Sequence, residues 1–109
     1  MKILLDENLP KKLKFSFASE HELLTVRDMN WLGKRNGELL GLLTLHGFNA
    51  FVTIDKNLQY QHNLDRFQIH LFVLDAPNNK IDTLEPYIKE LALLLEQPMD
   101  NQVLVVCLD

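Results

Sequence analysis

Two acidic residues stand directly after short apolar runs of this 109-residue chain. Asp6 follows the run at residues 1–5, and Asp55 follows the run at 50–54. Runs of four or five residues rich in Ile, Leu, Val and Phe are too short for helices and are typical of buried parallel strands. In open α/β sheets, ligands bind in the crevice at the carboxyl ends of such strands. Asp6 and Asp55 are therefore the first candidates for a functional site.

A third acid, Glu38, falls in the first turn of a helix that we expect after residue 36. It faces the same crevice if the irregular stretch 27–35 returns the chain to that edge of the sheet. Carboxylates in close contact raise one another's pKa or are neutralised by a cation. Oxygen ligands without His or Cys favour Mg²⁺ or Mn²⁺, and such an ion activates water and stabilises charge on a phosphodiester. We therefore expect Asp6, Glu38 and Asp55 to form a metal-binding catalytic site.

Each of these acids also has a purely structural interpretation. Asp6 can cap the helix that follows it. Glu38 can simply stabilise its own helix by lying near the positive end of the helix dipole. Asp55 can stabilise a turn. The three together are more specific than any one of them.

Strands and helices alternate along the whole sequence. We expect strands at 1–5, 23–26, 50–54, 69–74 and 103–108. We expect helices from about 10 to 18 after the capping residue Asn8, from 36 to Gly47, and from 82 or 83 to about 95. Such alternation with right-handed connections predicts an α/β fold, a three-layer α/β/α sandwich with a mostly parallel five-stranded sheet.

The composition indicates one soluble domain spanning residues 1–109. No apolar stretch approaches the roughly 18 to 20 residues of a membrane span, and no signal peptide is recognisable, so we expect a cytoplasmic protein without membrane contact. The single cysteine, Cys107, cannot form an internal disulfide. Its place in the apolar run 103–108 suggests a small buried hydrophobic side chain.

Charge is distributed unevenly along the chain. The net charge of -4 argues against a general nucleic-acid binder, because phosphate neutralisation needs clustered Lys and Arg. Residues 1–66 nevertheless hold nine Lys/Arg and eight Asp/Glu, whereas 67–109 hold two and seven. Six basic residues lie within a few positions of a candidate acid: Lys11, Lys12, Lys14, Lys34, Arg35 and Lys56. They either form ordinary solvated surface or steer an anionic substrate.

Several motifs occur in an order that resembles a known family. They are LLDENLP at 4–10, VRDM at 26–29, NGELL at 36–40 and VTIDKNL at 52–58, followed by QYQHNL at 59–64. Together they resemble the small stand-alone PIN-like domains that are predicted toxin–antitoxin nucleases, and they cover roughly residues 1–75. The resemblance implies a PIN-type fold and metal-dependent phosphodiester hydrolysis, most often of RNA, with Asp6, Glu38 and Asp55 as the acidic site. It also implies an antitoxin protein as a partner.

The chain departs from the PIN-like pattern at Asn57, where many members carry a further acid two residues after the strand-three Asp. An amide can still ligate a metal or orient water, but it brings no charge. With three acids a second metal is held weakly, which points to a one-ion site or a low-activity enzyme. Asn57 can equally serve only as a turn residue.

Other polar residues near these acids are weaker candidates for substrate binding. Asn8 and Asn36 each flank a site acid but are also good helix caps. Lys56 follows Asp55, and Tyr60 and Gln61 lie a few residues further on. Aromatic side chains such as Tyr60 often stack on unpaired bases, although this ring can equally pack inward.

Two other functions compete with the nuclease. A phosphoacceptor receiver domain also places acids after its first and third strands, but this chain lacks the Ser or Thr after strand four and the Lys after strand five that such a domain uses. A PIN-like module that has lost catalysis and only binds RNA or an antitoxin is the other alternative, and Asn57 is the reason to consider it. Formation of a homodimer is plausible for so small a domain.

Overall fold

Five strands alternate with helical segments in the computed structural model, which describes residues 1–17, 20–58, 64–98 and 101–108. The elements of these ranges follow one another in this order: β1 (Lys2–Leu5), the 3-10 helix η1 (Lys11–Ser16), β2 (Glu22–Thr25), α1 (Asn36–Leu45), β3 (Ala50–Thr53), the 3-10 helix η3 (Leu64–Arg66), β4 (His70–Leu74), α2 (Ile81–Leu95) and β5 (Val103–Val106). The radius of gyration of 12.7 Å is that of a single packed domain.

The strands form one sheet in the order β2-β1-β3-β4-β5, and all four pairings are parallel. The chain moves from β1 to β2 in one direction and then crosses back to place β3 on the other side of β1. The strand order therefore reverses between β1 and β3, which is the topological switch point where open α/β sheets bind their ligands. The predicted mostly parallel five-stranded sheet is confirmed.

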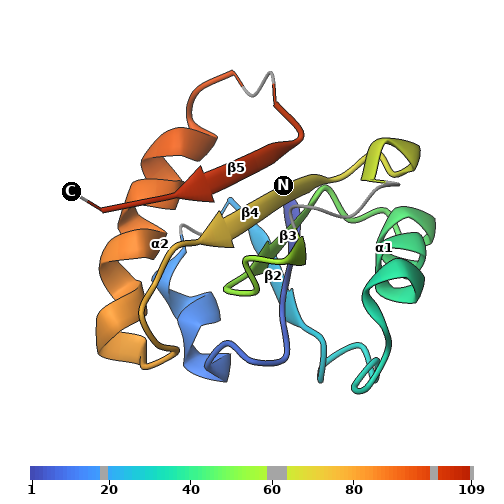
Figure 1. Cartoon of the computed structure of the whole chain (residues 1–109), viewed down its shortest axis with the longest axis horizontal. Coiled ribbons are helices and arrows are strands. Elements are labelled where there is room, and N and C mark those ends of the chain that lie inside the picture. Colours follow the sequence, from blue (N-terminus) through green and yellow to red (C-terminus); the bar gives the residue numbers. More distant parts are fainter. Residues whose placement is uncertain (18–19, 59–63, 99–100, 109) are drawn as a thin grey trace.

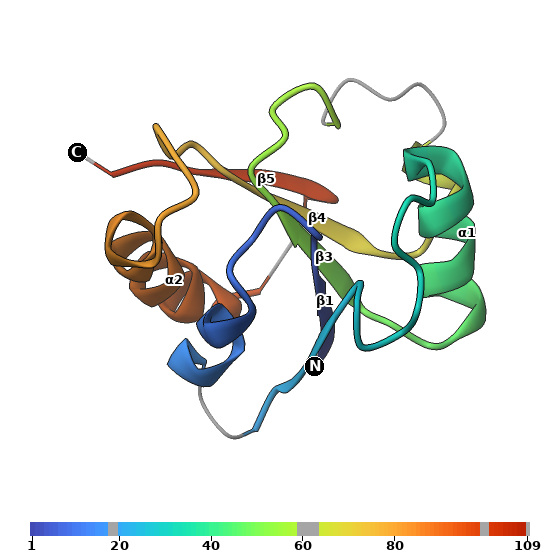
Figure 2. The same ribbon diagram turned by 90° about the horizontal axis from the view of Figure 1, so that it is seen from below.

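Helices cover both faces of this sheet, as Figures 1 and 2 show. On one face, Leu4 and Phe51 pack against the core that contains α1. On the other face, Ile3 and Leu5 belong to the core that contains η1 and α2. Successive strand residues point to opposite faces, so the apolar runs of the sequence supply both cores at once. The predicted three-layer α/β/α arrangement is confirmed.

The two long helices form where the sequence predicts them. The apolar positions of α2 recur every three or four residues, and Leu84, Ile88 and Leu91 are buried against the sheet. The helix α1 ends before Gly47, whose φ of 76° is the left-handed conformation expected of a glycine at a helix C-terminus. Neither helix is long and apolar enough to cross a membrane, and the same holds for the other helical segments of the described ranges.

The first helix and the helix starts differ from the sequence-based expectations. The predicted α-helix at about 10–18 is the six-residue 3-10 helix η1, which starts after Pro10 and has no side-chain cap. A 3-10 helix rises about 2.0 Å per residue, so six residues return the chain about 12 Å across the sheet. The helix α1 already includes Asn36, and α2 starts after Lys80, with Asp82 inside its first turn. Asn8 and Asn36 are therefore not the N-cap residues, and α2 begins at Ile81, before the expected start at 82 or 83.

The connection from β4 to β5 has the opposite hand to two earlier connections. The step from β1 to β2 passes through η1, and the step from β4 to β5 passes through α2 on the same face of the sheet (Figure 2). These steps run in opposite directions across a parallel sheet. Since β1-η1-β2 and β2-α1-β3 are right-handed, as parallel crossovers nearly always are, β4-α2-β5 is left-handed. The short η1 leaves much of this face uncovered, and the 15-residue α2 covers it.

Cys107 is exposed, which contradicts its predicted burial. The strand β5 ends at Val106, which is the buried residue of the described run 103–108, and the chain then leaves the sheet. The Sγ atom of Cys107 lies 3.8 Å from Oδ2 of Asp75. An apolar run at the edge of a sheet is therefore buried for only part of its length.

Candidate carboxylate site at the switch point

Asp6 and Asp55 lie at the carboxyl ends of the two strands that flank the switch point. Asp6 follows β1 directly, and its N–H donates to the carbonyl oxygen of Val52 in β3 at 2.9 Å. Asp55 lies two residues beyond the end of β3. The charge of Asp55 acts on Asp6, so the two carboxylates share one electrostatic environment. The two acids that the sequence singles out first are therefore neighbours.

Thr53, the last residue of β3, connects the two acids. Its hydroxyl group donates a hydrogen bond to Oδ2 of Asp6 at 2.6 Å. The hydroxyl oxygen of Thr53 also accepts a hydrogen bond from the backbone N–H of Asp55 at 3.0 Å. The Thr53 side chain is completely buried. Sequence reasoning missed this residue, although a hydroxyl at the end of an otherwise apolar strand was a usable signal, because a buried polar group needs a partner.

Burial raises the pKa of Asp6 above its ordinary value of 3.8, and the charges of Glu7 and Asp55 raise it further. Hydrogen bonds from Thr53 and from the backbone N–H of Glu7, the latter at 2.8 Å to Oδ1, oppose this shift without cancelling it. Each carboxylate oxygen has two lone pairs, so both oxygens of Asp6 can accept further contacts. A cation beside Asp6 and Asp55 relieves both the burial cost and the repulsion.

Four aspartates line the carboxyl edge of the sheet, in the order Asp28, Asp6, Asp55 and Asp75 along β2, β1, β3 and β4. The outer two have lysine partners. Lys14 lies 3.4 Å from Asp28, and Lys56 lies 2.7 Å from Asp75, where its hydrogen bond and charge lower the pKa of Asp75. Within the described residues, the central pair has no basic partner. Neither Asp6 nor Asp55 is therefore neutralised by an ion pair among these residues.

Glu38 does not join the central pair. Its carboxylate forms an exposed ion pair with Lys34 at 3.8 Å, within the loop and first turn that start α1. Among the residues that the structure describes, no three His, Cys, Asp or Glu side chains are grouped so as to hold a metal ion. The expected convergence of three acids is therefore absent from the described part of the chain. The loop 27–35 places α1 over the opposite face from η1, with Glu38 turned toward Lys34 instead of Asp6.

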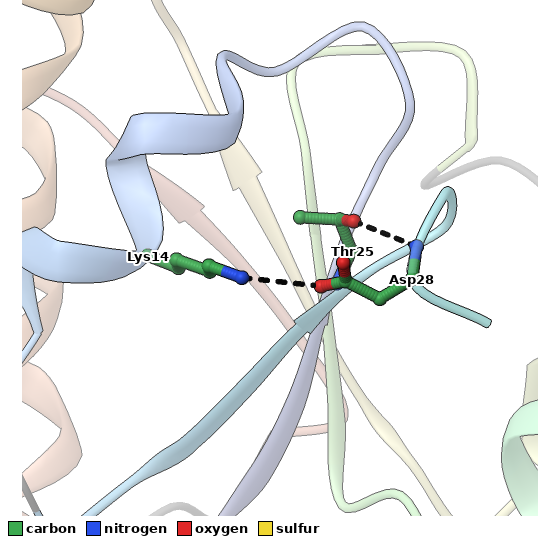
Figure 3. Close-up of polar contacts among 3 residues, drawn as sticks. All are labelled: Lys14, Thr25 and Asp28. Carbon is green, nitrogen blue, oxygen red and sulfur yellow. Dashed lines mark hydrogen bonds and ion pairs between the residues drawn. The ribbon is translucent and has the colours of Figure 1, made fainter.

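Asp28 forms a compact capping arrangement at the end of β2, shown in Figure 3. Its Oδ2 accepts the backbone N–H of Thr25 at 2.9 Å and faces Lys14 Nζ, while Thr25 Oγ1 accepts the N–H of Asp28 at 3.0 Å. The hydrogen bond from the Thr25 backbone lowers the pKa of Asp28, and Lys14 lowers it further. This carboxylate fixes the turn after β2 and ties it to η1.

Replacing Asp28 by Ala is expected to lower the free energy of unfolding by about 1 kcal/mol at pH 7. The substitution removes the carboxylate oxygen that accepts hydrogen bonds from the Thr25 backbone N–H and from Lys14. The Asp28 pKa lies below its ordinary value of 3.8, so the stabilisation is present above pH 4 and is lost as the pH falls through the folded-state pKa. Urea denaturation at pH 7 and pH 3 measures both effects. Glu85→Ala, an exposed acid of α2, is the control. Equal losses at both pH values for Asp28→Ala would contradict this role.

A small cavity adjoins Asp6 on the side of β2. It has a volume of about 50 Å³, and its wall includes the acids Asp6 and Glu7, the bases Lys11 and Arg27, and Thr25. This volume accommodates a few water molecules. The cavity therefore brings both signs of charge to the edge of the carboxylate pair.

The remaining predicted site residues have varied placements. The backbone N–H of Asn57 donates to Oδ1 of Asp55 at 3.0 Å, so Asp55 also stabilises its own turn, and the Asn57 side chain is exposed. The Asn8 side chain is exposed, and its carbonyl accepts Nδ2 of Asn79 at 2.9 Å. Lys56 contacts Asp75.

Three predictions of substrate contacts are not tested by these placements. Tyr60 and Gln61 lie outside the described residues. The side chain of Asn36 lies outside the description as well, although its backbone starts α1.

These elements define an open parallel α/β domain with a pair of carboxylates at its switch point. No protein-family model matches the chain, and neither the curated proteins nor the solved structures include a significant match. The resemblance to PIN-like domains therefore rests on the sequence motifs alone and stays a prediction.

Proposed function

We propose that the protein is a hydrolase of phosphodiesters that depends on Mg²⁺ or Mn²⁺ and cleaves RNA. One observation carries the proposal: Asp6 and Asp55 form a half-buried carboxylate pair at the switch point, and within the described residues neither acid forms an ion pair. Ionised Asp6 is costly at neutral pH, mainly because it is buried and to a smaller extent because Glu7 and Asp55 carry like charge, and a positively charged ligand relieves this cost. The structural role of a cap or turn accounts for the backbone contacts but not for this cost.

The residues present suit a hard divalent ion. Asp6 and Asp55 would hold it, because Mg²⁺ is bound through one or two carboxylates and keeps several of its waters. When bound, such an ion supplies an activated water and positive charge beside a phosphate. Thr53 orients the Asp6 carboxylate, and the backbone N–H of Glu7 fixes its second oxygen. The chain's own contribution is thus a rigid pair of ligands at an open sheet edge.

The PIN-like motifs support RNA as the substrate, and a toxin–antitoxin pair as the setting. They also raise the question of a third ligand. Glu38 pairs with Lys34 in an exposed position, and Asn57 supplies an amide where many PIN-like proteins have an acid. We propose a one-ion site of low activity, with an antitoxin protein and a second copy of the chain as further possible partners.

A receiver-type phosphoacceptor is the second candidate, because one observation favours it. The strand order 2-1-3-4-5 is shared by flavodoxin-like and receiver domains, in which the same switch point binds the ligand. Against it, β4 is followed by Asp75 and Ala76 without a hydroxyl. Incubation with a small phosphodonor distinguishes the two functions, because stable labelling of Asp55 is expected only of a receiver.

The direct test of the nuclease is cleavage of a labelled single-stranded RNA. We expect cleavage with Mg²⁺ or Mn²⁺ and none with EDTA, and restoration when the ion is returned. Gel analysis of the 5′- and 3′-labelled RNA reports internal cuts. Absence of cleavage of both RNA and DNA at millimolar metal, or equal cleavage in EDTA, would refute the proposed activity.

A further inference from the structure

Two bases of the cavity beside Asp6 have no acidic partner among the described residues. Lys11 and Arg27 both line this cavity, and within the described ranges neither forms an ion pair. Lys14, Lys34 and Lys56, in contrast, are paired with acids. Lys11 and Arg27 are therefore the cations beside the carboxylate pair that are available to an anionic ligand.

An exposed aromatic ring lies on η1, the 3-10 helix that begins at Lys11. Phe15, in η1, has 78% of its surface exposed. The Nζ atom of Lys14 lies 5.6 Å from the centre of this ring and 3.4 Å from Asp28 Oδ2. Asp28 in turn accepts the N–H of Thr25, which lines the cavity.

The positions of these residues suit a single-stranded nucleic acid. Phosphates need cations, and unpaired bases stack on exposed aromatic rings, with every base offering a π-face. The cavity, at about 50 Å³, is too small for a nucleotide but can admit the oxygens of a phosphate. A base therefore has to lie outside, on the surface of η1, where Phe15 is exposed.

We propose that Lys11 and Arg27 bind a backbone phosphate of single-stranded RNA beside Asp6, and that Phe15 stacks against a base of the same strand. The kind of substrate rests on the proposed nuclease function. Lys11 and Phe15 of η1, together with Arg27 after β2, form the surface that we name the η1 track. It lies on the β2 side of the carboxylate pair and holds the strand next to Asp6.

The first test measures binding of a fluorescent single-stranded RNA of eight nucleotides by anisotropy, in EDTA, at several salt concentrations. Lys11→Gln and Arg27→Gln are each expected to weaken binding severalfold. Each is also expected to reduce the slope of log Kd against log salt by about 0.7, the value for one phosphate contact on a single strand. Arg66→Gln removes one charge from the segment that precedes the amino end of β4, whereas Asp6 follows the carboxyl end of β1. This control variant should leave the slope unchanged. Equal changes in all three variants would show general charge attraction and overturn the proposal.

The second test concerns stacking. Phe15→Ala is expected to weaken binding about tenfold without changing the salt slope, whereas Phe15→Trp retains it. Leu45→Ala is the matched control, because Leu45 is also 78% exposed but lies on α1, over the other face. If Phe15→Ala and Leu45→Ala bind alike, or if double-stranded RNA binds as tightly as the single strand, Phe15 does not stack on a base.

An acidic protein segment is the alternative occupant of the η1 track. A poly-glutamate peptide that binds more tightly than the RNA, with the same dependence on Lys11 and Arg27 but none on Phe15, would overturn the proposal in favour of a protein partner. Because binding is measured in EDTA, it does not depend on catalysis. Track-dependent binding without cleavage in Mg²⁺ refutes only the nuclease, and cleavage without track-dependent binding refutes only the η1 track.

Discussion

Asp6→Asn and Asp55→Asn are each expected to slow metal-dependent RNA cleavage by about 1,000-fold. Each substitution removes one of the two charges that would hold the ion, and an amide oxygen is a much weaker ligand than a carboxylate for a hard cation. Single-turnover cleavage of labelled RNA at saturating Mg²⁺ measures the loss. A rise in the metal concentration needed for half-maximal rate is expected alongside it.

Asp75→Asn is the matched control for these variants. Asp75 also lies at the carboxyl end of a strand, but Lys56 neutralises it at 2.7 Å, so its loss should change the cleavage rate by less than about threefold. Glu38→Gln separately tests the third predicted ligand, since a large loss would require Glu38 to leave Lys34 when metal binds. Cleavage by Asp6→Asn and Asp55→Asn at the rate of Asp75→Asn would contradict the catalytic role of the pair.

Thr53→Val is expected to lower the free energy of unfolding by about 2–3 kcal/mol at pH 7. The change leaves Oδ2 of Asp6 without its donor and the N–H of Asp55 without its acceptor, in a position where water does not replace the hydroxyl. Urea denaturation measures the loss. Thr53→Ser keeps the hydroxyl and is expected to lose no more than about 1 kcal/mol, mainly through the missing methyl group.

The pH dependence of this loss identifies its cause. The Asp6 pKa is raised in the folded protein, so ionised Asp6 costs stability at neutral pH, and this cost disappears as the pH falls through the folded-state pKa. Losing the Thr53 hydrogen bond raises that pKa further, because the bond favours the charged form. The difference between Thr53→Val and wild type should therefore shrink on acidification. A difference that is constant from pH 7 to pH 4 would mean that Thr53 acts by packing alone.

The sheet and both long helices could be predicted because their signals are local. Short apolar runs predict buried strands, and the spacing of Leu84, Ile88 and Leu91 predicts one face of α2. The order of strands, however, depends on which faces the helices cover. The left-handed β4-α2-β5 connection places α2 on the same face as the short η1, and no residue pattern within α2 specifies that face.

The candidate site was predictable only where a strand positions the residue. Asp6 and Asp55 follow adjacent strands, so their proximity follows from the pairing of β1 with β3. Glu38 is positioned by the irregular loop before α1, whose path the sequence does not determine, and it pairs with Lys34 instead. Thr53 was overlooked because its residue type is common in strands, and only its contacts with both acids show its role.

Anomalous scattering from a crystal soaked in Mn²⁺ tests the central claim most directly. The expected result is one peak about 2.1 Å from carboxylate oxygens of both Asp6 and Asp55, which is the distance of magnesium-type coordination. This peak should be absent from a crystal of Asp55→Asn. The same map shows whether Glu38 joins the ion or stays with Lys34. A crystal that binds Mn²⁺ elsewhere while no peak lies between Asp6 and Asp55 would contradict the proposed site.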